Sequence, residues 1–267
     1  MNPSKLACPL TIESLLAAAL LLLTGCQTPQ AATESGQRTA TPASVLRIGV
    51  TPNVPPMIFK RGREFVGVEA DLARLLAAEL GKAPEFVEVP WEEQIEALRS
   101  GRTDIIMSSM SVTPARATRI EFTQPYMRSG QMAVVRRSEA AGLRIGMFST
   151  DYRVGAQKAT TGDFFVQQEM PRAKRVTYSN AEAGAKAVRK KRIDVFIHDA
   201  PVAWWLASEN EAEGLTVIPV LLTEEYLAWG IRKENAELVQ ATNQFVEKLR
   251  QNGQLQNIVR TWIPLWN

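Results

Sequence analysis

The chain has 267 residues, of which 45% are hydrophobic and 22% are charged, and its net charge is only +3. Acidic and basic residues are mixed throughout, so the charge pattern gives no indication of a nucleic-acid partner. The one basic run, residues 189–192, is interpreted as the solvated end of a helix. Two cysteines, Cys8 and Cys26, exclude a disulfide-rich scaffold, and the hydrophobic fraction suffices for a sizeable core.

The N-terminus predicts export. Residues 15–23 form an apolar run that is too short to span a bilayer, which takes about 20 residues. The run leads into Leu23-Thr24-Gly25-Cys26, which resembles the cleavage site of bacterial lipoproteins. This resemblance implies a signal peptide over residues 1–25 and lipidation of Cys26, with an acyl chain such as palmitate, in an extracytoplasmic, membrane-anchored protein. The alternative is an ordinary secretory signal in which the cysteine occurs by chance.

Residues 26–44 are polar and show no apolar periodicity, which predicts a disordered tether. From Val45 onward, segments with strand and helix patterns alternate. Strands are expected at 46–50, 85–89, 104–108, 131–136, 143–148, 174–178, 193–198 and 226–231, and helices at 67–80, 92–99, 152–158, 181–191, 201–208, 237–249 and 255–262. Ser179 and Glu182 have the spacing of a capping box at one helix start. Two such series favour an α/β protein with two lobes, each a sheet covered by helices.

The segment from Ser108 to Arg116 carries the strongest indication of a binding site. It places hydroxyl groups at a strand end, then Thr113 and Pro114 at a helix start, with a guanidinium in the first turn. Such a combination suits a carboxylate. His198 and Asp199 end a strand of the second series, and ligands of open α/β sheets bind beyond the carboxyl ends of strands. We therefore expect the two strand ends to face each other across a cleft.

Several segments together resemble the extracytoplasmic solute-binding proteins of family 3, the amino-acid-binding receptors of ABC importers. The segment from Ser111 to Tyr126 is similar to the most recognisable motif of that family. Residues 67–72 are similar to its first-helix signature, and residues 192–199 to the strand that delivers a ligand-binding aspartate. Trp91 matches the aromatic residue that lies over the ligand.

The resemblance implies a two-lobe periplasmic-binding-protein fold of type II, in which each lobe has a mixed or parallel sheet flanked by helices. Lobe 1 would comprise residues 45–129 and 224–267, and lobe 2 residues 130–223. Two crossing segments, near residues 128–130 and 223–225, would form a hinge, and the ligand would close the lobes.

The resemblance also implies roles in the site. Arg116 would hold an α-carboxylate with help from the Ser111 hydroxyl, and Asp199 would hold the α-ammonium from the opposite lobe. Trp91 would pack on the apolar part of the ligand, and Ser108 and Ser109 would be lesser polar contacts.

Three of these residues have other interpretations. Asp199 could cap the helix that starts at Pro201, and Trp91 could be a core aromatic. His198, the only histidine, is interpreted as a strand residue with a satisfied ring rather than as a ligand or catalyst.

Two departures from the family pattern concern the ligand. Thr51 and Val54 occupy the positions of an acidic and an aromatic residue near the ligand amine, which weakens the case for a basic amino acid. In lobe 2 the loop 148–152 is expected to reach the cleft, and there Thr150 replaces a glycine and Tyr152 adds bulk. Both departures indicate an unusual ligand.

Three function classes follow. The first is a lipid-anchored, monomeric receptor that captures a small zwitterion or carboxylate, foremost an amino acid, for an ABC permease, without catalytic residues, metal or cofactor. The second is a dehydratase acting on prephenate or arogenate, for which Glu69, Glu92, Asp151 and Asp199 are the available acids. The third is a sensory or cell-wall-associated binding lipoprotein.

Overall fold

The computed structural model describes residues 44–146 and 151–264, with only the backbone for residues 145 and 146. The predicted signal peptide, Cys26, the tether up to residue 43 and Thr150 lie outside the described residues. Among the helices of the described part, none is long and apolar enough to cross a membrane.

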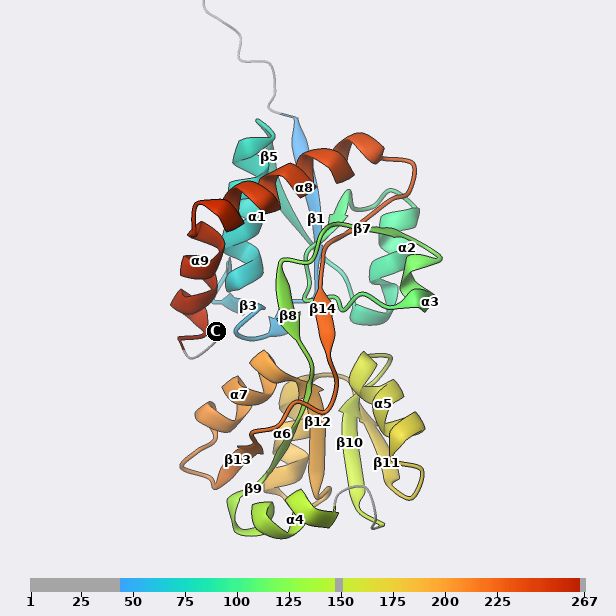
Figure 1. Cartoon of the computed structure of the whole chain (residues 1–267), viewed down its shortest axis with the longest axis vertical. Coiled ribbons are helices and arrows are strands. Elements are labelled where there is room, and N and C mark those ends of the chain that lie inside the picture. Colours follow the sequence, from blue (N-terminus) through green and yellow to red (C-terminus); the bar gives the residue numbers. More distant parts are fainter. Residues whose placement is uncertain (1–43, 147–150, 265–267) are drawn as a thin grey trace, which may run out of the picture. The chain divides into compact units, whose positions relative to one another are not determined.

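The first sheet has the strand order β5-β1-β6-β15-β7 (Figure 1). Three parallel strands lie on one side and two short strands continue the sheet in antiparallel pairing: β1 (Val45–Val50), β5 (Ala83–Glu88), β6 (Ile105–Ile106), β7 (Glu121–Phe122) and β15 (Gly230–Ile231). Its helices are α1 (Val68–Glu79), η1 (Trp91–Glu93), α2 (Gln94–Arg99), α3 (Pro114–Ala117), α8 (Ala236–Gln251) and α9 (Gln254–Trp262). A separate small sheet of β2 (Asn53–Val54), β3 (Ile58–Arg61) and β4 (Glu64–Val66) contacts helix α1. We call this assembly lobe 1.

The second sheet has the order β11-β10-β12-β9-β13. Again three parallel strands are continued by two strands in antiparallel pairing, in which β9 pairs with both β12 and β13: β9 (Gln131–Arg136), β10 (Arg153–Gln157), β11 (Lys174–Tyr178), β12 (Val195–Asp199) and β13 (Leu215–Ile218). Its helices are η2 (Arg137–Glu139), α4 (Ala140–Gly146), α5 (Thr161–Glu169), α6 (Ala181–Arg189) and α7 (Ala200–Glu209). We call this assembly lobe 2.

The chain passes between the two sheets on a two-stranded antiparallel ribbon, β8 (Met127–Ser129) with β14 (Glu225–Leu227) (Figure 1). At Gly130 the two segments come so close that a Cβ atom would lie 2.1 Å from the carbonyl oxygen of Thr223. Only glycine fits this crossing without displacing the backbone of the other segment. The ribbon lies where the sequence predicts the hinge, and the predicted lobe boundaries and hinge motion stay predictions.

Most predicted elements are present, but the elements predicted for the start of lobe 2 are wrong. The segment expected as strand 143–148 begins as the end of helix α4, and the segment expected as helix 152–158 is strand β10. The predicted capping box is also wrong, because Asn180 caps α6 by accepting a hydrogen bond from the N–H of Ala183. The expected strand 226–231 is split into β14 and β15 around the fully buried Trp229.

The two sheets share one arrangement of charges at the start of their central strands. In lobe 1, Arg47 donates from its main-chain N–H, Nε and Nη2 to Asp104, and from Nη1 to the carbonyl of Gly101. In lobe 2, Arg153 donates in the same way to Asp194 and to the carbonyl of Lys191. Gly101 and Lys191 both have positive φ, which is strained for lysine.

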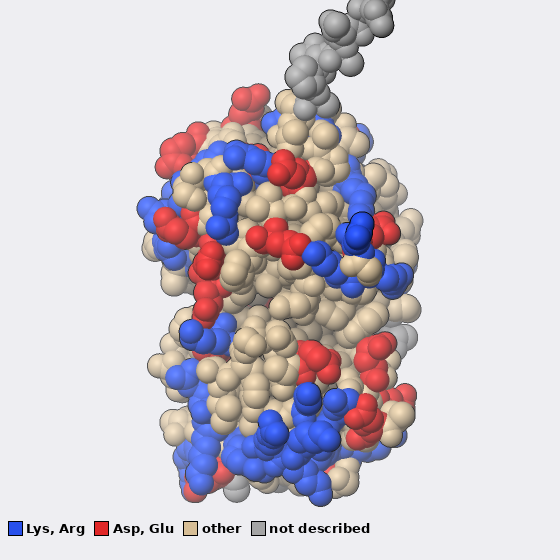
Figure 2. All heavy atoms as spheres, turned by 180° about the vertical axis from the view of Figure 1, so that it is seen from behind, with Lys and Arg blue, Asp and Glu red and all other residues tan. Residues whose placement is uncertain are grey.

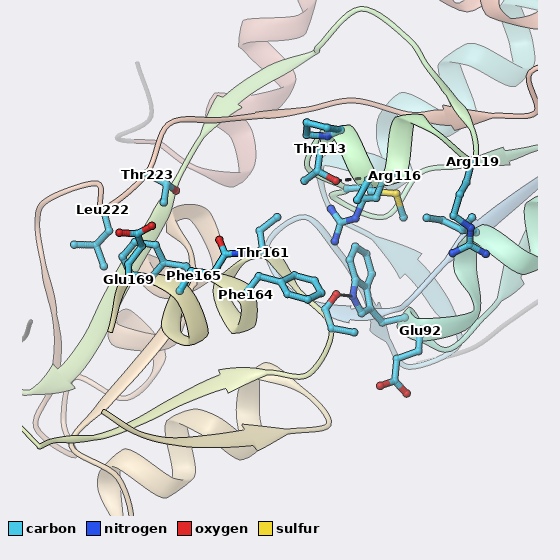
Figure 3. Close-up of a pocket in the computed structure, with 17 residues that line it drawn as sticks. Glu92, Thr113, Arg116, Arg119, Thr161, Phe164, Phe165, Glu169, Leu222 and Thr223 are labelled. Atoms are coloured by element: carbon cyan, nitrogen blue, oxygen red, sulfur yellow. Dashed lines mark hydrogen bonds between the residues drawn. The ribbon is translucent and has the colours of Figure 1, made fainter. Parts of the chain in front are cut away.

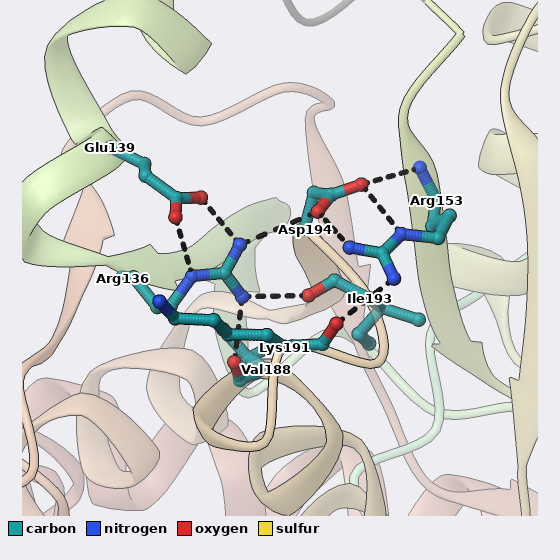
Figure 4. Close-up of polar contacts among 7 residues, drawn as sticks. All are labelled: Arg136, Glu139, Arg153, Val188, Lys191, Ile193 and Asp194. Carbon is teal, nitrogen blue, oxygen red and sulfur yellow. Dashed lines mark hydrogen bonds and ion pairs between the residues drawn. The ribbon is translucent and has the colours of Figure 1, made fainter.

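A second arginine completes each arrangement from the neighbouring antiparallel strand or its end. Arg232 donates to the carbonyls of Leu98 and Thr103, and Arg136 donates to those of Val188 and Ile193 (Figure 4). Both guanidinium groups also reach the aspartate of their lobe, at 3.7 Å from Asp104 and 3.4 Å from Asp194. The strand orders and these contacts together show that the lobes are two versions of one unit.

Lysine and arginine side chains gather on one face of lobe 2 (Figure 2). Residues 190–192 are exposed at the end of α6, whereas Arg189 is partly buried and pairs with Glu213 at 2.5 Å. This agrees with a solvated helix end, because the cations lie where the helix dipole favours them.

Candidate ligand site

A small pocket lies between the carboxyl ends of the two sheets. Its volume is about 20 Å³, which is room for about one water molecule. The pocket brings together seven side chains that the sequence singled out, from both lobes: Val54, Trp91, Ser108, Ser109, Ser111, Arg116 and Asp199.

Arg116 is half-buried, and its surroundings fix its position. Its Nη1 donates to the carbonyl of Ser111 at 2.7 Å, and its guanidinium lies 5.1 Å from the centre of the Trp91 ring. Within the described part of the chain Arg116 forms no ion pair. Burial lowers the pKa of Arg116, while the charges of Asp199 and Glu225 act in the opposite direction. An arginine so placed stays cationic and can still receive an anion.

The helix start next to Arg116 forms as predicted but is short. Thr113 accepts a hydrogen bond from the N–H of Arg116 at 3.2 Å, and Pro114 is the first helical residue. The helix has only four residues. Its dipole is therefore weak, and the guanidinium is the main attraction for an anion.

Asp199 occupies the N-cap position of α7, but its side chain makes no capping hydrogen bond. Its Oδ1 instead accepts a hydrogen bond from Nε2 of Gln131 at 2.6 Å. Burial, together with the charge of Glu225, raises the pKa of Asp199 to about 7, although Gln131 and Arg116 act in the opposite direction. The capping interpretation is thus wrong, and the carboxylate is available to a cation in the pocket.

The serine segment is held from behind by Glu69, which is fully buried. This carboxylate accepts hydrogen bonds from the N–H of Ser109, the hydroxyl of Tyr126 and the indole of Trp229, all between 2.6 and 2.7 Å. Burial raises the pKa of Glu69 to about 7 against these three hydrogen bonds. Glu69 therefore supports the strand end at Ser109, which has a positive φ, and does not line the pocket.

Thr51 is buried and does not line the pocket, whereas Val54 does. The N–H of Thr51 donates to Oγ of Ser108 at 2.9 Å, and its hydroxyl donates to the carbonyl of Val89. Thr51 therefore acts on the pocket by positioning Ser108.

Three lining residues of lobe 2 are not singled out by the sequence: Gln157, Thr160 and Thr161. They end or follow strand β10, a segment that the sequence predicts as a helix. A signal was present in the sequence, because Arg153-Val-Gly in β10 parallels Arg47-Ile-Gly in β1. His198, which the sequence analysis interprets as a strand residue with a satisfied ring, also lines the pocket.

The expectation for Tyr152 is wrong. This side chain is partly buried and packs on the second core cluster, and Tyr152 precedes β10 at the amino end of the strand. The pocket lies at the carboxyl end, so Tyr152 cannot reach it. The turn that does reach the pocket is the one at Thr160 and Thr161, at the start of α5.

The lobes touch on both sides of the pocket. On one side, the indole of Trp91 donates to the carbonyl of Ala159 at 3.0 Å, and Glu92 pairs with Lys158 at 2.9 Å. On the other side, Phe59 lies 5.6 Å from Trp205 between ring centres. Trp91 is thus both a partner of the adjoining core cluster and a contact between lobes.

Outside the pocket, a groove of about 1160 Å³ continues between the lobes. Arg116 and Arg119 lie along one side of it, and Phe164 reaches towards them from α5 (Figure 3). Phe164 is half exposed. Arg116 borders both the groove and the pocket, so an anion could reach it from the groove.

The four acids considered for catalysis are not brought together. Among them only Asp199 lines the pocket. Glu69 is sealed behind Ser109, Glu92 pairs with Lys158, and Asp151 pairs with Arg172 at 3.5 Å. Among the described residues there is also no cluster of three or more His, Cys, Asp and Glu that could hold a metal ion.

Comparison with known proteins decides the family. The sequence model of the bacterial extracellular solute-binding proteins, family 3, matches residues 46–264. The chain belongs to this family. Its similarity extends over nearly the whole of the part that the structure describes.

Among curated proteins, ABC transporter arginine-binding protein 1 of Escherichia coli K12 is 26% identical over 238 residues, covering 84% of this chain and 93% of that protein. The probable histidine-binding protein of Neisseria gonorrhoeae is 26% identical over 254 residues, covering 92% of each. Among solved structures, the ancestral amino acid-binding protein AncCDT-1, a precursor of cyclohexadienyl dehydratase, is 31% identical with a TM-score of 0.76, covering 82% of this chain and 95% of that chain. An ancestral arginine-binding protein bound to arginine is 26% identical with a TM-score of 0.75, covering 83% and 99%.

These neighbours confirm the fold predicted from the sequence. This family member has the type II periplasmic-binding-protein fold, with two α/β lobes whose mixed sheets are flanked by helices.

Proposed function

We propose that this chain is an extracytoplasmic receptor that binds a small amino acid between its lobes and delivers it to an ABC importer. One observation carries the proposal: a guanidinium of lobe 1 that forms no ion pair among the described residues and a carboxylate of lobe 2 that makes no capping hydrogen bond line the same pocket. The two groups match the two charges of an α-amino acid. Relatives named as amino-acid-binding proteins of ABC transporters support the assignment.

The mechanism follows from the positions of these groups. Arg116 receives the α-carboxylate, with the Ser111 hydroxyl beside it, and Trp91 packs against the guanidinium. Asp199 receives the α-ammonium. Because the charges belong to different lobes, only the closed arrangement satisfies both, so the ligand stabilises closure through contacts that the open arrangement lacks. The ribbon of β8 and β14 is the proposed hinge.

The direct test is thermal unfolding of the purified chain with each of the twenty amino acids and a set of organic acids. A ligand at 100 times its Kd adds about 2.7 kcal/mol of stability. This should raise the Tm by roughly 5–10 °C for a body of this size. If no compound of the panel raises the Tm, the receptor function is contradicted.

Ligand affinity should depend on pH through Asp199. The free carboxyl has a pKa of about 7, and the ligand ammonium binds its ionised form, so affinity falls as the pH drops below 7. The Kd should be roughly thirty-fold weaker at pH 5.5 than at pH 8. Arg116, His198 and Glu225 face Asp199. They do not reverse this sign, because Arg116 stays cationic, burial holds the pKa of His198 at about 4, and the charge of Glu225 only raises the pKa of Asp199.

Isothermal titration calorimetry at both pH values, in buffers of different ionisation enthalpy, measures the affinity and the released proton. Asp199→Asn is the control: it should bind weakly and show no such pH dependence. A Kd of the wild-type protein that is the same at both pH values would contradict the assigned role of Asp199.

The dehydratase alternative rests on two observations. One structural neighbour is a precursor of cyclohexadienyl dehydratase, and the pKa of Asp199 is raised to about 7, as a general acid requires. Against it, no second acid of the four candidates lines the pocket. Incubation with prephenate and with arogenate should give no aromatic product by ultraviolet absorbance, and product formation would establish the alternative.

We also propose that Cys26 carries the lipid anchor and that residues 27–44 are the tether, as the sequence pattern predicts. The acylated N-terminus would keep the receptor close to a membrane. Mass spectrometry of the membrane-extracted protein, compared with a Cys26→Ala variant, tests this directly.

A further inference from the structure

Part of the pocket lining, here called one end of the pocket, lies at equivalent positions of the two lobes: Ser108 in lobe 1, and Gln157 and His198 in lobe 2. Asp104 and Asp194 are the equivalent aspartates of the two lobes. Ser108 and His198 follow them at the same spacing in the sequence, so these two residues occupy equivalent positions. Counting from the paired arginines, Thr51 corresponds to Gln157. Each pair is joined by a hydrogen bond: the N–H of Thr51 donates to Ser108 Oγ, and the ring of His198 contacts Gln157 Oε1 at 3.1 Å. The lobes therefore present two matched, uncharged pairs of polar residues at this end.

The tautomer of His198 is fixed by its neighbours. Its Nδ1 accepts a hydrogen bond from the N–H of Asp199 at 2.8 Å, so the proton lies on Nε2 and is donated to Gln157. Burial keeps the pKa of this ring at about 4, and the ring is neutral at physiological pH. Both nitrogen atoms are occupied, and His198 offers the ligand neither a charge nor a free hydrogen-bonding group.

Two lining residues, Gln157 and Ser108, have donors without an acceptor among the described residues. Gln157 is 3% exposed, and its Oε1 is used by His198, while its Nε2 has no hydrogen bond among the described residues. Ser108 is 2% exposed, and its Oγ accepts from Thr51, while its own proton has no acceptor among them. Val54 supplies an apolar wall. A ligand group that accepts hydrogen bonds would therefore find donors here that no described residue uses.

Charge and size limit the ligand further. Arg116 and Asp199 are the only ionised side chains that line the pocket within the described residues, and the two ends of an amino acid use both. A charged ligand side chain would then be buried without a counterion, which is unfavourable. As it stands the pocket holds about one water molecule, so it must widen to admit any amino acid, and a small amino acid requires the least widening.

We propose, resting on the receptor function above, that this end of the pocket selects a small amino acid whose side chain is uncharged and accepts a hydrogen bond, as in serine, threonine or asparagine. Gln157 is the specificity-determining residue, since its amide donates to that side chain. The ligand class thus differs from the arginine named for two of the relatives.

The experiment is calorimetric titration of serine, threonine, asparagine, arginine, lysine and glutamate into the wild-type protein and Gln157→Glu. This substitution keeps the acceptor for His198 but replaces the donor by a carboxylate oxygen. The wild type should bind serine, threonine or asparagine more tightly than the three charged amino acids. In Gln157→Glu the Kd for the preferred ligand should rise about tenfold or more. Gln256→Glu, the same change at an exposed position of α9, should leave the Kd unchanged.

Two outcomes overturn the inference while leaving the receptor function intact: tighter binding of arginine, lysine or glutamate by the wild type, or an unchanged Kd in Gln157→Glu. Absence of binding for all six amino acids together with the rest of the panel of twenty would instead contradict the receptor function itself. The circular-dichroism spectrum and Tm of Gln157→Glu, compared with the wild type, show whether the variant is folded.

Discussion

Replacing Arg116 with methionine is expected to abolish amino acid binding at ordinary concentrations. The substitution removes the only cation that lines the pocket within the described residues, and leaves the ligand carboxylate buried without a partner. Breaking a buried pair in this way costs about 3–5 kcal/mol, which is at least about a hundredfold in Kd. Methionine keeps an apolar stem against Trp91, so the fold should be retained. Calorimetric titration measures the Kd.

Arg119→Met is the matched control for this prediction. Arg119 lies three residues further along, is about half exposed and contacts Glu96 at 3.4 Å. Its loss should leave the Kd unchanged, because an exposed pair contributes little. The role of Arg116 would be refuted if the two variants weakened binding to the same extent, or if Arg116→Met bound like the wild type.

Asp194→Ala is expected to cause the largest loss of stability. Asp194 joins Arg153 and Arg136 at the start of β12, and the Arg136 side chain is only 10% exposed (Figure 4). Without the carboxylate, Arg136 keeps Glu139 and two carbonyls, while Arg153 loses its ion-pair partner and keeps the carbonyl of Lys191. Because hydrogen bonds to charged groups contribute about 1.5–3 kcal/mol each, we expect a loss of about 3 kcal/mol in the free energy of unfolding, or roughly 10 °C in Tm.

Urea unfolding at neutral pH, followed by circular dichroism, checks this prediction. Burial raises the pKa of Asp194, but its hydrogen bonds with Arg153 lower it more, so the net pKa lies below the usual value. Its contribution is therefore fully present at neutral pH and is lost only as the pH falls through that lowered pKa. Glu209→Ala removes an exposed carboxylate of the same lobe and should leave stability within about 0.5 kcal/mol. Equal stability of the two variants would contradict the assigned role of Asp194.

Lobe 1 could be predicted from the sequence because its local signals agree with its tertiary structure. Thr113, Pro114 and Arg116 form the predicted helix start, and the apolar spacing of residues 67–80 gives α1 within one residue. Arg116 and Asp199 line one pocket, as expected from the rule that ligands of open α/β sheets bind beyond the carboxyl ends of the strands.

The start of lobe 2 shows where local sequence fails. Residues 46–49 and 143–146 are both Leu-Arg-Ile-Gly, yet the first lies in β1 and the second in α4. What distinguishes β1 is a distant partner: Arg47 binds Asp104, 57 residues away. Arg153 has the corresponding partner, Asp194. A contact of this range cannot be read from periodicity, and the misplaced strand moved the expected cleft loop to Thr150 and Tyr152.

The polar network behind Asp199 was also beyond prediction. Gln131 begins β9 and Glu225 begins β14, so they lie at the two segments that connect the lobes. Nε2 of Gln131 donates to Glu225 at 2.9 Å, and the hydroxyl of Thr161 donates to Glu225 at 2.8 Å. None of the three stands out by its neighbours in sequence. Their importance arises only from the folded topology.

The paired arginine and aspartate in each lobe have a consequence for how this molecule can change. In lobe 2, Arg153 anchors one end of a strand whose other end, Gln157, faces the guest, and the two are separated by roughly 13 Å. The part that secures the framework is therefore physically remote from the part that discriminates between compounds. New preferences can arise by exchanging a few residues at one rim, while the scaffold beneath is left undisturbed.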